Sequence, residues 1–560
     1  MPEIIAFVAY ESPWAPAGGI AAVMGRLPPA LLAAAKRPTI AITPFHHRSA
    51  RTAGLATQHV GNVQVGYGRD KIPVAVLRHD AGCPWYFLQP AAGAPAGEPP
   101  FFGGERHPYD VPMPVLLRDA LFFGAAAGQA LAAIDESARW DLLLQDWEAA
   151  TAALAVASQQ QPRSERLRLT LHNTYDAFAP LEALTRVGID PQRCPGDTIL
   201  QRALGLVESP VFTVSEQFAL DLTDDLLQRR ILAPHLQDLL ARRRVLGVDN
   251  GPFTDLRVDP ALLGRAAAGE PGPLAQWKAE QQRQALAALA GHAPSDERPV
   301  WGDPSRFRRD DSPWFVMAGR DDPRQKGYDV AALAIDDYLS GHQTRRSRAQ
   351  FLFFPVPGDE GLAGLTFLKA LAERHPEDVL VLPFIWQAGF MAALQGAAYA
   401  LMPSLYEPFG MANEFYLQGC VGIGRATGGI VEQIVPLRGA AAFGEAVRAR
   451  TARFHPMSAP PTGLLFREPD DIDSALADWM AIHDARYDKR GGSPSRVEER
   501  GRYTVIQAMV GELRVSIEDA VKIVVGRPEL YYRMLAEGVG YIGRTFSWER
   551  AAHEYARRLA

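Results

Sequence analysis

Three short segments of the chain combine glycines with charged or polar side chains in a way that suits a bound anion. In the first, residues 10–20, Gly18 and Gly19 follow an apolar run and precede a stretch with helical periodicity. Paired glycines before a helix let backbone N–H groups approach an anion closely, and the helix dipole adds a favourable field. Such a pair also occurs in ordinary tight turns between a strand and a helix. This segment alone therefore leaves both interpretations open.

The second segment, residues 404–412, also follows an apolar run, and residues 425–430 come shortly after it. Glu407 can accept hydrogen bonds from the hydroxyls of a sugar or a ribose. Gly410 and Met411 could present backbone N–H groups at the start of a helix. An exposed glutamate in a turn is the simpler interpretation of Glu407 taken alone. Two such segments at this spacing, each at a predicted strand end, favour a ligand site instead.

The third segment, residues 319–329, carries Arg320 and Lys326 directly after the apolar run 314–318. Two fixed cations at a strand end suit a diphosphate leaving group, because its negative charge grows in the transition state. An isolated basic pair is more often part of a surface turn with ion pairs. Because the Glu407 segment accompanies it, we interpret this pair as a phosphate site.

Polar residues also follow two predicted strands in the first half of the chain. Gln145 and Asp146 come after one apolar run, and His172 and Asn173 come after the next. The carboxyl ends of parallel strands are where ligands of such sheets bind. His172 alone would more often be a structural histidine. Because the Gln145–Asp146 segment accompanies it, a structural role and a role in the site both stay open.

The elements that must position these residues are short apolar runs separated by helix-like stretches. The first half contains runs at 4–9, 39–43, 141–144 and 167–171, and the second half repeats the pattern from residue 314 onward. Continuous apolar strands that alternate with helices indicate parallel sheets covered on both faces. We therefore predict two doubly wound α/β domains, 1–300 and 313–535, joined by a charged linker at 301–312, with ligands bound in the cleft between them.

Composition excludes several classes of protein. The 560 residues include 58 Lys and Arg against 64 Asp and Glu, a net charge of −6, which argues against nucleic-acid and acidic-membrane partners. Three widely spaced cysteines, Cys83, Cys194 and Cys420, predict neither a disulfide framework nor a thiolate zinc cage. The first residues lack a basic region, and the apolar stretches near 120–134 and 388–403 are too short or too interrupted to span a bilayer. We expect a cytoplasmic protein.

These segments, in this order, resemble motifs of the bacterial glycogen synthases and plant starch synthases. The likeness runs almost end to end. It includes Glu11 with Gly18–Gly19, Asp146–Trp147, His172–Asn173, Asn250–Gly251, Gln325–Lys326–Gly327, Glu407–Pro408, Thr427–Gly428–Gly429 and Phe546–Ser547–Trp548. The resemblance implies the GT-B fold, in which two Rossmann-like domains face each other across a deep cleft. It also implies that a final helix, 536–560, crosses back to the first domain.

The same resemblance implies an activity. Enzymes of this family transfer glucose, with retention of configuration, from ADP- or UDP-glucose to the non-reducing end of an α-glucan or oligosaccharide. The reaction needs no metal, and the nucleotide-sugar is a substrate, so no cofactor is expected. The leaving diphosphate is thought to help deprotonate the acceptor hydroxyl.

The family's functional residues map onto this sequence position by position. Arg320 and Lys326 would neutralise the donor diphosphate, and Glu407 would hold donor hydroxyls, with Gln145 and His172 completing the predicted catalytic set. The implied substrate-binding residues are Gly18, Gly19, Asp146, Asn173, Asn250, Trp386 (by rough position, against the base), Tyr406, Gly410, Met411, Thr427, Gly428 and Gly429.

Several positions depart from the family pattern. Pro16 replaces a lysine near the glycine pair, Gln145 replaces the histidine of the His-Asp-Trp motif, and Pro114–Val115 replaces an acidic pair. The spacing between Arg320 and Lys326 is also one residue longer than usual. We therefore expect a divergent relative. The alternatives are a catalytically silent paralogue that binds nucleotide-sugar or glycan, and a GT-B enzyme that glycosylates a small molecule.

Overall fold

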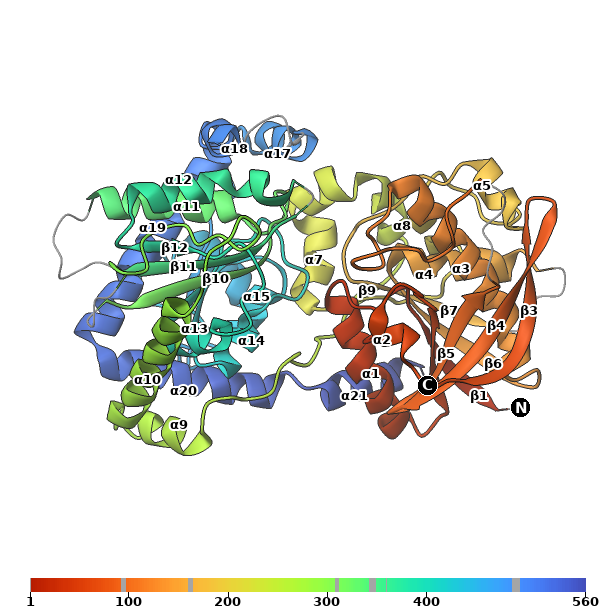
Figure 1. The fold of residues 1–560 in the computed structure, drawn as a ribbon, viewed down its shortest axis with the longest axis horizontal. Coiled ribbons are helices and arrows are strands. Elements are labelled where there is room, and N and C mark those ends of the chain that lie inside the picture. Colours follow the sequence, from red (N-terminus) through yellow and green to blue (C-terminus); the bar gives the residue numbers. More distant parts are fainter. Residues whose placement is uncertain are drawn as a thin grey trace. The chain divides into compact units, whose positions relative to one another are not determined.

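The computed structural model of the chain describes residues 2–91, 97–159, 165–307, 312–341, 349–358, 360–485 and 494–559. It divides into two compact units, which we call the first and the second unit (Figure 1). The first unit comprises Met1–Phe253 together with Phe546–Ala560, and the second comprises Thr254–Thr545. Each unit is built around one β-sheet.

The sheet of the first unit has nine strands in the order β3-β4-β5-β2-β1-β6-β7-β8-β9. Their bounds are β1 Glu3–Val8, β2 Thr39–Pro44, β3 Gln58–Tyr67, β4 Asp70–Ala81, β5 Cys83–Pro90, β6 Arg139–Gln145, β7 Arg166–Leu171, β8 Val211–Thr213 and β9 Val245–Gly247. The central strands β1, β6 and β7 are almost entirely buried, as expected of parallel strands covered on both faces.

The prediction of parallel-sheet α/β units is confirmed, with one difference at an edge of this sheet. From β5 to β9 all neighbours are parallel, whereas β3 with β4 and β4 with β5 are antiparallel. The turns that reverse the chain contain Gly68 and Gly82, both at positive φ. Because β4 alternates between buried and exposed residues near its start, it behaves as a half-exposed antiparallel strand.

Two helices from opposite ends of the chain pack together in the first unit. They are α1 (Gly19–Ala35) and α21 (Trp548–Leu559), which lie side by side in Figure 1. Trp548, Tyr555 and Leu559 of α21 share one apolar core with residues of β1 and α1. The Trp548 indole N–H donates to the carbonyl of Pro252 at 2.8 Å. The end of the chain therefore completes the core of the first unit.

One helix of the first unit, α3 (Met113–Ile134), is long and apolar enough to cross a membrane by length and composition. We had expected the stretch at 120–134 to be too short, but the helix begins seven residues earlier. Its most apolar part is 72% buried within the protein, and a core helix passes the same test. It packs against α4 (Asp146–Ala157), where the Thr151 hydroxyl donates to the carbonyl of Ala120 at 2.8 Å.

The other helices of the first unit are short. They are α2 Ala50–Ala53, α5 Leu181–Arg186, α6 Ile199–Leu204, α7 Glu216–Asp224, α8 Gln237–Ala241 and the single turns η1 Gln228–Leu232 and η2 Pro234–Leu236. Local capping explains two of their starts. Thr198 and Gln201 form a reciprocal capping box on α6, and Ser215 caps α7.

The second unit has a six-stranded, wholly parallel sheet in the order β12-β11-β10-β13-β14-β15. The strands are β10 Trp314–Arg320, β11 Gln350–Val356, β12 Val379–Val381, β13 Tyr399–Met402, β14 Val421–Arg425 and β15 Leu464–Phe466. Figure 1 shows α11 and α12 on one side of strands β10–β12 and α13 with α14 on the other. The helices are α9 Pro260–Ala267, α10 Gly272–Ala290, α11 Tyr328–Gly341, η4 Gly361–Leu365, α12 Thr366–Arg374, α13 Phe390–Gly396, α14 Ala412–Leu417, α15 Gly428–Gln433, α16 Glu445–Thr451, α17 Ala475–Asp484, α18 Pro494–Arg500, α19 Thr504–Gly526 and α20 Pro528–Thr545.

The boundary between the units lies earlier than the charged linker predicted at 301–312, of which residues 308–311 fall outside the described residues. Helices α9 and α10 already belong to the second unit. The buried Lys278 of α10 donates to the carbonyls of Gln395, Ala397 and Gly419 at 2.6–3.0 Å, which fastens this helix to α13 and to the start of β14. Helix α20 also belongs to the second unit, so the return to the first unit comprises 546–560 rather than 536–560.

Candidate functional site

The second unit brings together the two segments that we predicted to bind a nucleotide-sugar. Strands β10 and β13 are parallel neighbours, so the segments that follow them start from the same edge of the sheet. Lys326 Nζ lies 2.7 Å from Glu407 Oε2, and the Ser404 hydroxyl donates to the same oxygen at 3.1 Å. Both charged side chains are largely buried, with 18% of Lys326 and 10% of Glu407 exposed. Arg320 lies exposed at the end of β10.

The segment 427–429 supports the backbone of the Glu407 turn. The Gly429 N–H donates to the Glu407 carbonyl at 3.2 Å. A Cβ atom on Gly428 would lie 1.6 Å from that carbonyl oxygen, and one on Gly429 would lie 2.0 Å from the carbonyl oxygen of Phe409. Gly428 also has a φ of +46°, which favours glycine. These two glycines are therefore needed for close backbone packing beneath Glu407, whether or not a substrate contacts them.

Gln433 was not predicted from the sequence, and it controls the start of α14. Its Oε1 accepts hydrogen bonds from the N–H groups of Ala412 and Asn413 at 3.0 and 3.4 Å, and its Nε2 donates to the Phe409 carbonyl at 2.8 Å. The first turn of this helix is thus capped by a buried side chain. The predicted phosphate contacts of Gly410 and Met411, which precede that turn, stay predictions.

Arg425 stabilises the backbone that leads into the Glu407 turn. It is completely buried, pairs with Glu468, and donates to the carbonyls of Ser404 and Leu405 at 3.4 and 2.6 Å. Because these carbonyls directly precede Glu407, the arginine fixes the path of the chain into the turn. Its signal in the sequence was only its position at the end of β14.

The remaining predicted residues of the second unit are buried. Tyr406 and Thr427 are 4% and 2% exposed. Trp386 is 5% exposed, its ring stacks on Phe354 at 6.0 Å, and Gly389 leaves just enough room for it. Little of the indole ring is therefore accessible to a nucleotide base, and its assignment rested only on approximate position.

The first unit brings its two polar motifs together as predicted. Asp146 accepts hydrogen bonds from the His172 backbone N–H at 2.6 Å and from Asn173 Nδ2 at 2.9 Å. His172 Nε2 donates to Gln145 Oε1 at 2.8 Å. Asp146 itself has a φ of +60°, so a conformation that is uncommon for aspartate holds the carboxylate in this position. Strands β6 and β7, which carry the two motifs, are parallel neighbours.

Burial makes this polar group largely neutral. It raises the pKa of Asp146 to about 8, because desolvation outweighs the hydrogen bonds from His172 and Asn173. It lowers the pKa of His172 to about 3. At neutral pH, His172 is therefore an uncharged hydrogen-bonding group rather than a cation. It is suited to binding hydroxyls and poorly suited to accepting a proton.

The glycine loop of the first unit is occupied by a carboxylate of the same chain. Glu11 accepts hydrogen bonds from the N–H groups of Ala17 and Gly18 at 2.9 and 2.7 Å. The Tyr109 hydroxyl donates to the other carboxylate oxygen at 3.0 Å. Gly18, which we predicted to donate to a phosphate, thus donates to Glu11 in this structure. Gly19 is the first residue of α1.

Glu148 was also missed from the sequence. It directly follows the Asp146–Trp147 pair and lies on the buried face of α4. Burial, followed by the charges of Asp146 and Glu11, raises the pKa of Glu148 well above its ordinary value. Burial likewise raises the pKa of Glu11. The first unit therefore contains a buried cluster of three carboxyl groups that resist ionisation.

Comparisons with known proteins indicate the kind of enzyme. Residues 4–233 match the family model described as starch synthase catalytic domain, and residues 272–414 match that of a family 4 glycosyltransferase in conflict systems. The glycogen synthase of Paramagnetospirillum magneticum is 25% identical over 447 residues, which cover 75% of this chain and 80% of that protein. That of Anaeromyxobacter dehalogenans is 26% identical over 469 residues, 77% and 85% of the two chains. The chain is a divergent glycosyltransferase that is similar to the glycogen and starch synthases.

A solved structure supports the fold of this glycosyltransferase. The catalytic domain of starch synthase IV from Arabidopsis thaliana superposes with a TM-score of 0.58 at 17% identity, covering 94% of this chain and all of that one. The fold is therefore GT-B.

The predicted residue Asn250 lies in the first unit of the glycosyltransferase. Asn250 is buried three residues after β9, and the next residue, Gly251, packs directly against Trp548 of α21. Within the described ranges, no group of three or more His, Cys, Asp or Glu residues is arranged to hold a metal ion.

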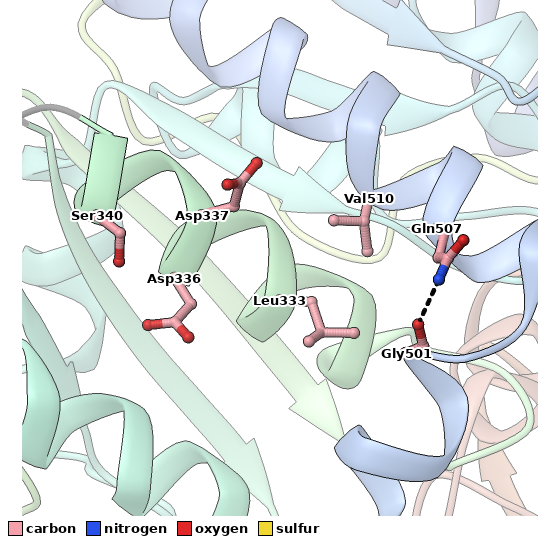
Figure 2. A pocket seen from close by; sticks show the side chains of 7 residues that line it. All are labelled: Leu333, Asp336, Asp337, Ser340, Gly501, Gln507 and Val510. Carbon is pink, nitrogen blue, oxygen red and sulfur yellow. Dashed lines mark hydrogen bonds between the residues drawn. The ribbon is translucent and has the colours of Figure 1, made fainter.

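A cavity of about 420 Å³ lies elsewhere in the second unit, between α11 and α19 (Figure 2). It is lined by Leu333, Asp336, Asp337, Ser340, Gly501, Gln507 and Val510. None of these residues belongs to the predicted substrate site.

Proposed function

We propose that this glycosyltransferase moves glucose from ADP- or UDP-glucose, or a similar hexose from its own nucleotide-sugar, to the non-reducing end of an α-glucan or oligosaccharide, with retention of configuration. The observation that carries the proposal is the 2.7 Å contact between Lys326 Nζ and Glu407 Oε2. It places a cation suited to phosphate next to a carboxylate suited to sugar hydroxyls, at the ends of adjacent parallel strands.

In the proposed reaction the bond between glucose C1 and the diphosphate oxygen breaks, and a bond from C1 to the acceptor oxygen forms on the same face. Arg320 and Lys326 stabilise the charge that develops on the leaving diphosphate, and no metal is required. A diphosphate oxygen takes the proton of the acceptor hydroxyl, so the nucleoside diphosphate carries it away. Because Glu407 already holds Lys326, little side-chain freedom remains to be lost when the donor binds.

The first unit supplies neutral groups for sugar hydroxyls in this proposal. His172 and Gln145 are bonded to each other, and Asn173 is held by Asp146. Uncharged amide and imidazole groups can donate to and accept from hydroxyls without the cost of burying a charge. We assign these residues to substrate binding and orientation.

The comparisons guide the choice of donor. The curated relatives are glycogen synthases, and the starch synthase IV structure was solved with ADP and acarbose. ADP-glucose is therefore the first donor to test and UDP-glucose the second. A cytoplasmic location is part of the same proposal, because Cys83, Cys194 and Cys420 are all unpaired thiols.

A catalytically silent paralogue that binds nucleotide-sugar or glycan is the second candidate. It is favoured by the Glu11 carboxylate, which takes the Gly18 N–H that a donor phosphate would need. Pro16 at a position where the family has a lysine points in the same direction. This candidate predicts ligand binding without turnover.

The test measures release of ADP or UDP from the corresponding nucleotide-glucose in the presence of glycogen or short maltooligosaccharides. We expect turnover by the wild type, and a loss of about 100-fold or more in kcat for Lys326→Ala and Glu407→Ala, the range seen when one charge-stabilising group is removed. Lys369→Ala is the matched control, because Lys369 forms an exposed pair with Glu373 on α12.

Calorimetric binding of donor without turnover would support the silent paralogue. Absence of both binding and turnover would refute both candidates. Mass spectrometry of the product separates a glucan from a glycosylated small molecule.

A further inference from the structure

Both predicted phosphate cations lie on one loop, Arg320–Gly327, which connects β10 to α11. The loop contacts the Glu407 segment on one side, because the Leu405 N–H donates to the Gln325 carbonyl at 2.7 Å. A Cβ atom on Gly327 would lie 2.2 Å from the Pro403 carbonyl oxygen, so the loop packs tightly there. The position of Lys326 relative to Glu407 therefore depends on how this loop is held.

At its start the loop is held by an arginine that lies 175 residues further along the chain. Asp321 accepts three hydrogen bonds from the two terminal nitrogens of the Arg496 guanidinium of α18 at 3.1–3.2 Å. Both side chains are almost completely buried, with 1% of Arg496 and 4% of Asp321 exposed. Arg496 also lies over the ring of Phe367 in α12, 4.4 Å from its centroid. Asp321 directly follows Arg320.

At its end the loop is held by a second arginine of α18. Arg500 donates to Asp329 at 2.8 Å, and both side chains are fully buried. Asp329 lies in the first turn of α11, two residues after Gly327.

The middle of the loop is tied to the end of α17. Arg324 donates to the carbonyls of His483 and Ala485 at 2.8 and 2.9 Å. The end of α17 and helix α18 therefore contact the loop, or the first turn of α11 that follows it, on both sides of Lys326.

We propose that Arg496 and Arg500 are positioning residues for donor binding and transfer: through Asp321 and Asp329 they hold the Arg320–Gly327 loop so that its cations stay aligned with Glu407. This inference rests on the proposed function, in which Arg320 and Lys326 contact the donor diphosphate. Apolar side chains could close the same space without the cost of desolvating four charges. What an ion pair adds is a defined geometry, through a bidentate contact for Arg496 with Asp321 and through one hydrogen bond for Arg500 with Asp329.

A double substitution separates positioning from simple stability. Arg496→Met leaves Asp321 buried without its partner, and this variant should lose both stability and activity. Adding Asp321→Asn removes the orphaned charge, so the double variant should regain most of the thermal stability. It should not regain the rate, because the loop is no longer anchored. A misplacement of about 1 Å can cost about 100-fold in rate.

The experiment compares the wild type, Arg496→Met, Arg496→Lys, Arg500→Met and Asp321→Asn/Arg496→Met. It measures Tm, and it measures kcat and KM with glycogen and whichever of ADP-glucose and UDP-glucose the wild type turns over faster. We expect the folded variants to lose about 10- to 100-fold in kcat/KM for the donor, with the KM for glycogen changed less than about twofold. Arg496→Lys, which keeps the charge but not the fork, should recover part of this loss.

Asp337→Asn is the matched control. Asp337 lies on the same helix as Asp329, lines the cavity in Figure 2, and forms an exposed pair with Arg514. Its donor kinetics should equal those of the wild type. Two results would overturn the positioning role without affecting the proposed function. One is wild-type donor kinetics in a folded Arg496→Met variant, and the other is recovery of rate together with stability in the double variant. A wild type that neither binds nor turns over a donor would overturn the proposed function as well.

Discussion

Lys326 and Glu407 are separated by 81 residues in the chain, and their side chains are 2.7 Å apart in the structure. The protonation state of a carboxyl group in this protein depends on its surroundings more than on whether it belongs to Asp or Glu. Glu407 is paired with a lysine, whereas Glu11, Asp146 and Glu148 are buried together with no cation against them in the described contacts. The second set is therefore held in its protonated form more readily than ordinary carboxyl groups.

Asp146 provides a prediction at the residue scale. Its pKa is about 8 in the folded protein and about 4 when unfolded. Between these values the folded state binds the extra proton, so its contribution to stability is present below about pH 4 and is lost as pH rises toward 8. The free energy of unfolding can be measured in urea at pH 5, 6.5 and 8. As pH rises, it should fall more steeply for the wild type than for Asp146→Asn, and the two slopes should differ by up to about 1.4 kcal/mol per pH unit. Parallel curves for the two proteins would contradict the assignment.

At the scale of elements, the Glu407 turn depends on how closely two backbone segments approach. Helix α15 begins at Gly428, which touches the carbonyl of Glu407, and Gln433 at its other end caps α14. One short helix thus positions both the carboxylate and the start of the next helix. The pattern Thr427–Gly428–Gly429 was visible in the sequence, but its role in backbone packing was not, because a pattern of glycines does not specify which carbonyl approaches them.

Gly428→Ala tests that role. The added Cβ would meet the Glu407 carbonyl oxygen at 1.6 Å and would sit on a residue at positive φ, so the turn must move. We expect a loss of about 2–4 kcal/mol in stability, in the range of strained or overpacked sites. The transfer rate should fall further than the loss of folded protein explains. Gly439→Ala is the control, since nothing lies within 4 Å of its Cβ position. Equal behaviour of the two variants in chemical unfolding and in nucleotide release would rule out the packing role.

At the scale of the whole molecule, the chain crosses between its units twice, after Phe253 and after Thr545. The last helix, α21, fills the core beside β1 and α1 with Trp548, Tyr555 and Leu559. The first unit is therefore complete only when the final residues have been synthesised. The closing motif 546–548 indicated this return. The charged segment near 301–312 gave a misleading boundary, because charged residues occur both in linkers between units and in segments within one unit.

Tyr555→Ala tests whether α21 is an integral part of the first unit. The tyrosine is buried, contacts Phe212, and lies 3.3 Å from the Thr170 hydroxyl, so truncation should cost about 3–5 kcal/mol. Hydrogen exchange should show lost protection in β1 and α1 and unchanged protection in β10 and β11. His553→Ala, an exposed position of the same helix, should leave both regions protected. Uniform loss of protection in both units would show that they unfold together instead.

Sequence patterns alone were enough to predict the α/β class, the parallel strands, and the polar motifs that follow them. These features depend on local patterns: apolar runs that must be buried, and glycines or charges placed where a strand ends. The sequence also indicated the family, because several short motifs occur in the same order. The folded chain was needed to show that Glu11 accepts from the Gly18 N–H, that Gln433 caps α14, and that Arg496 and Arg500 pair with Asp321 and Asp329. Except for the Glu11 contact, these contacts join residues far apart in the chain, and all of them depend on packing and burial, which no local pattern encodes.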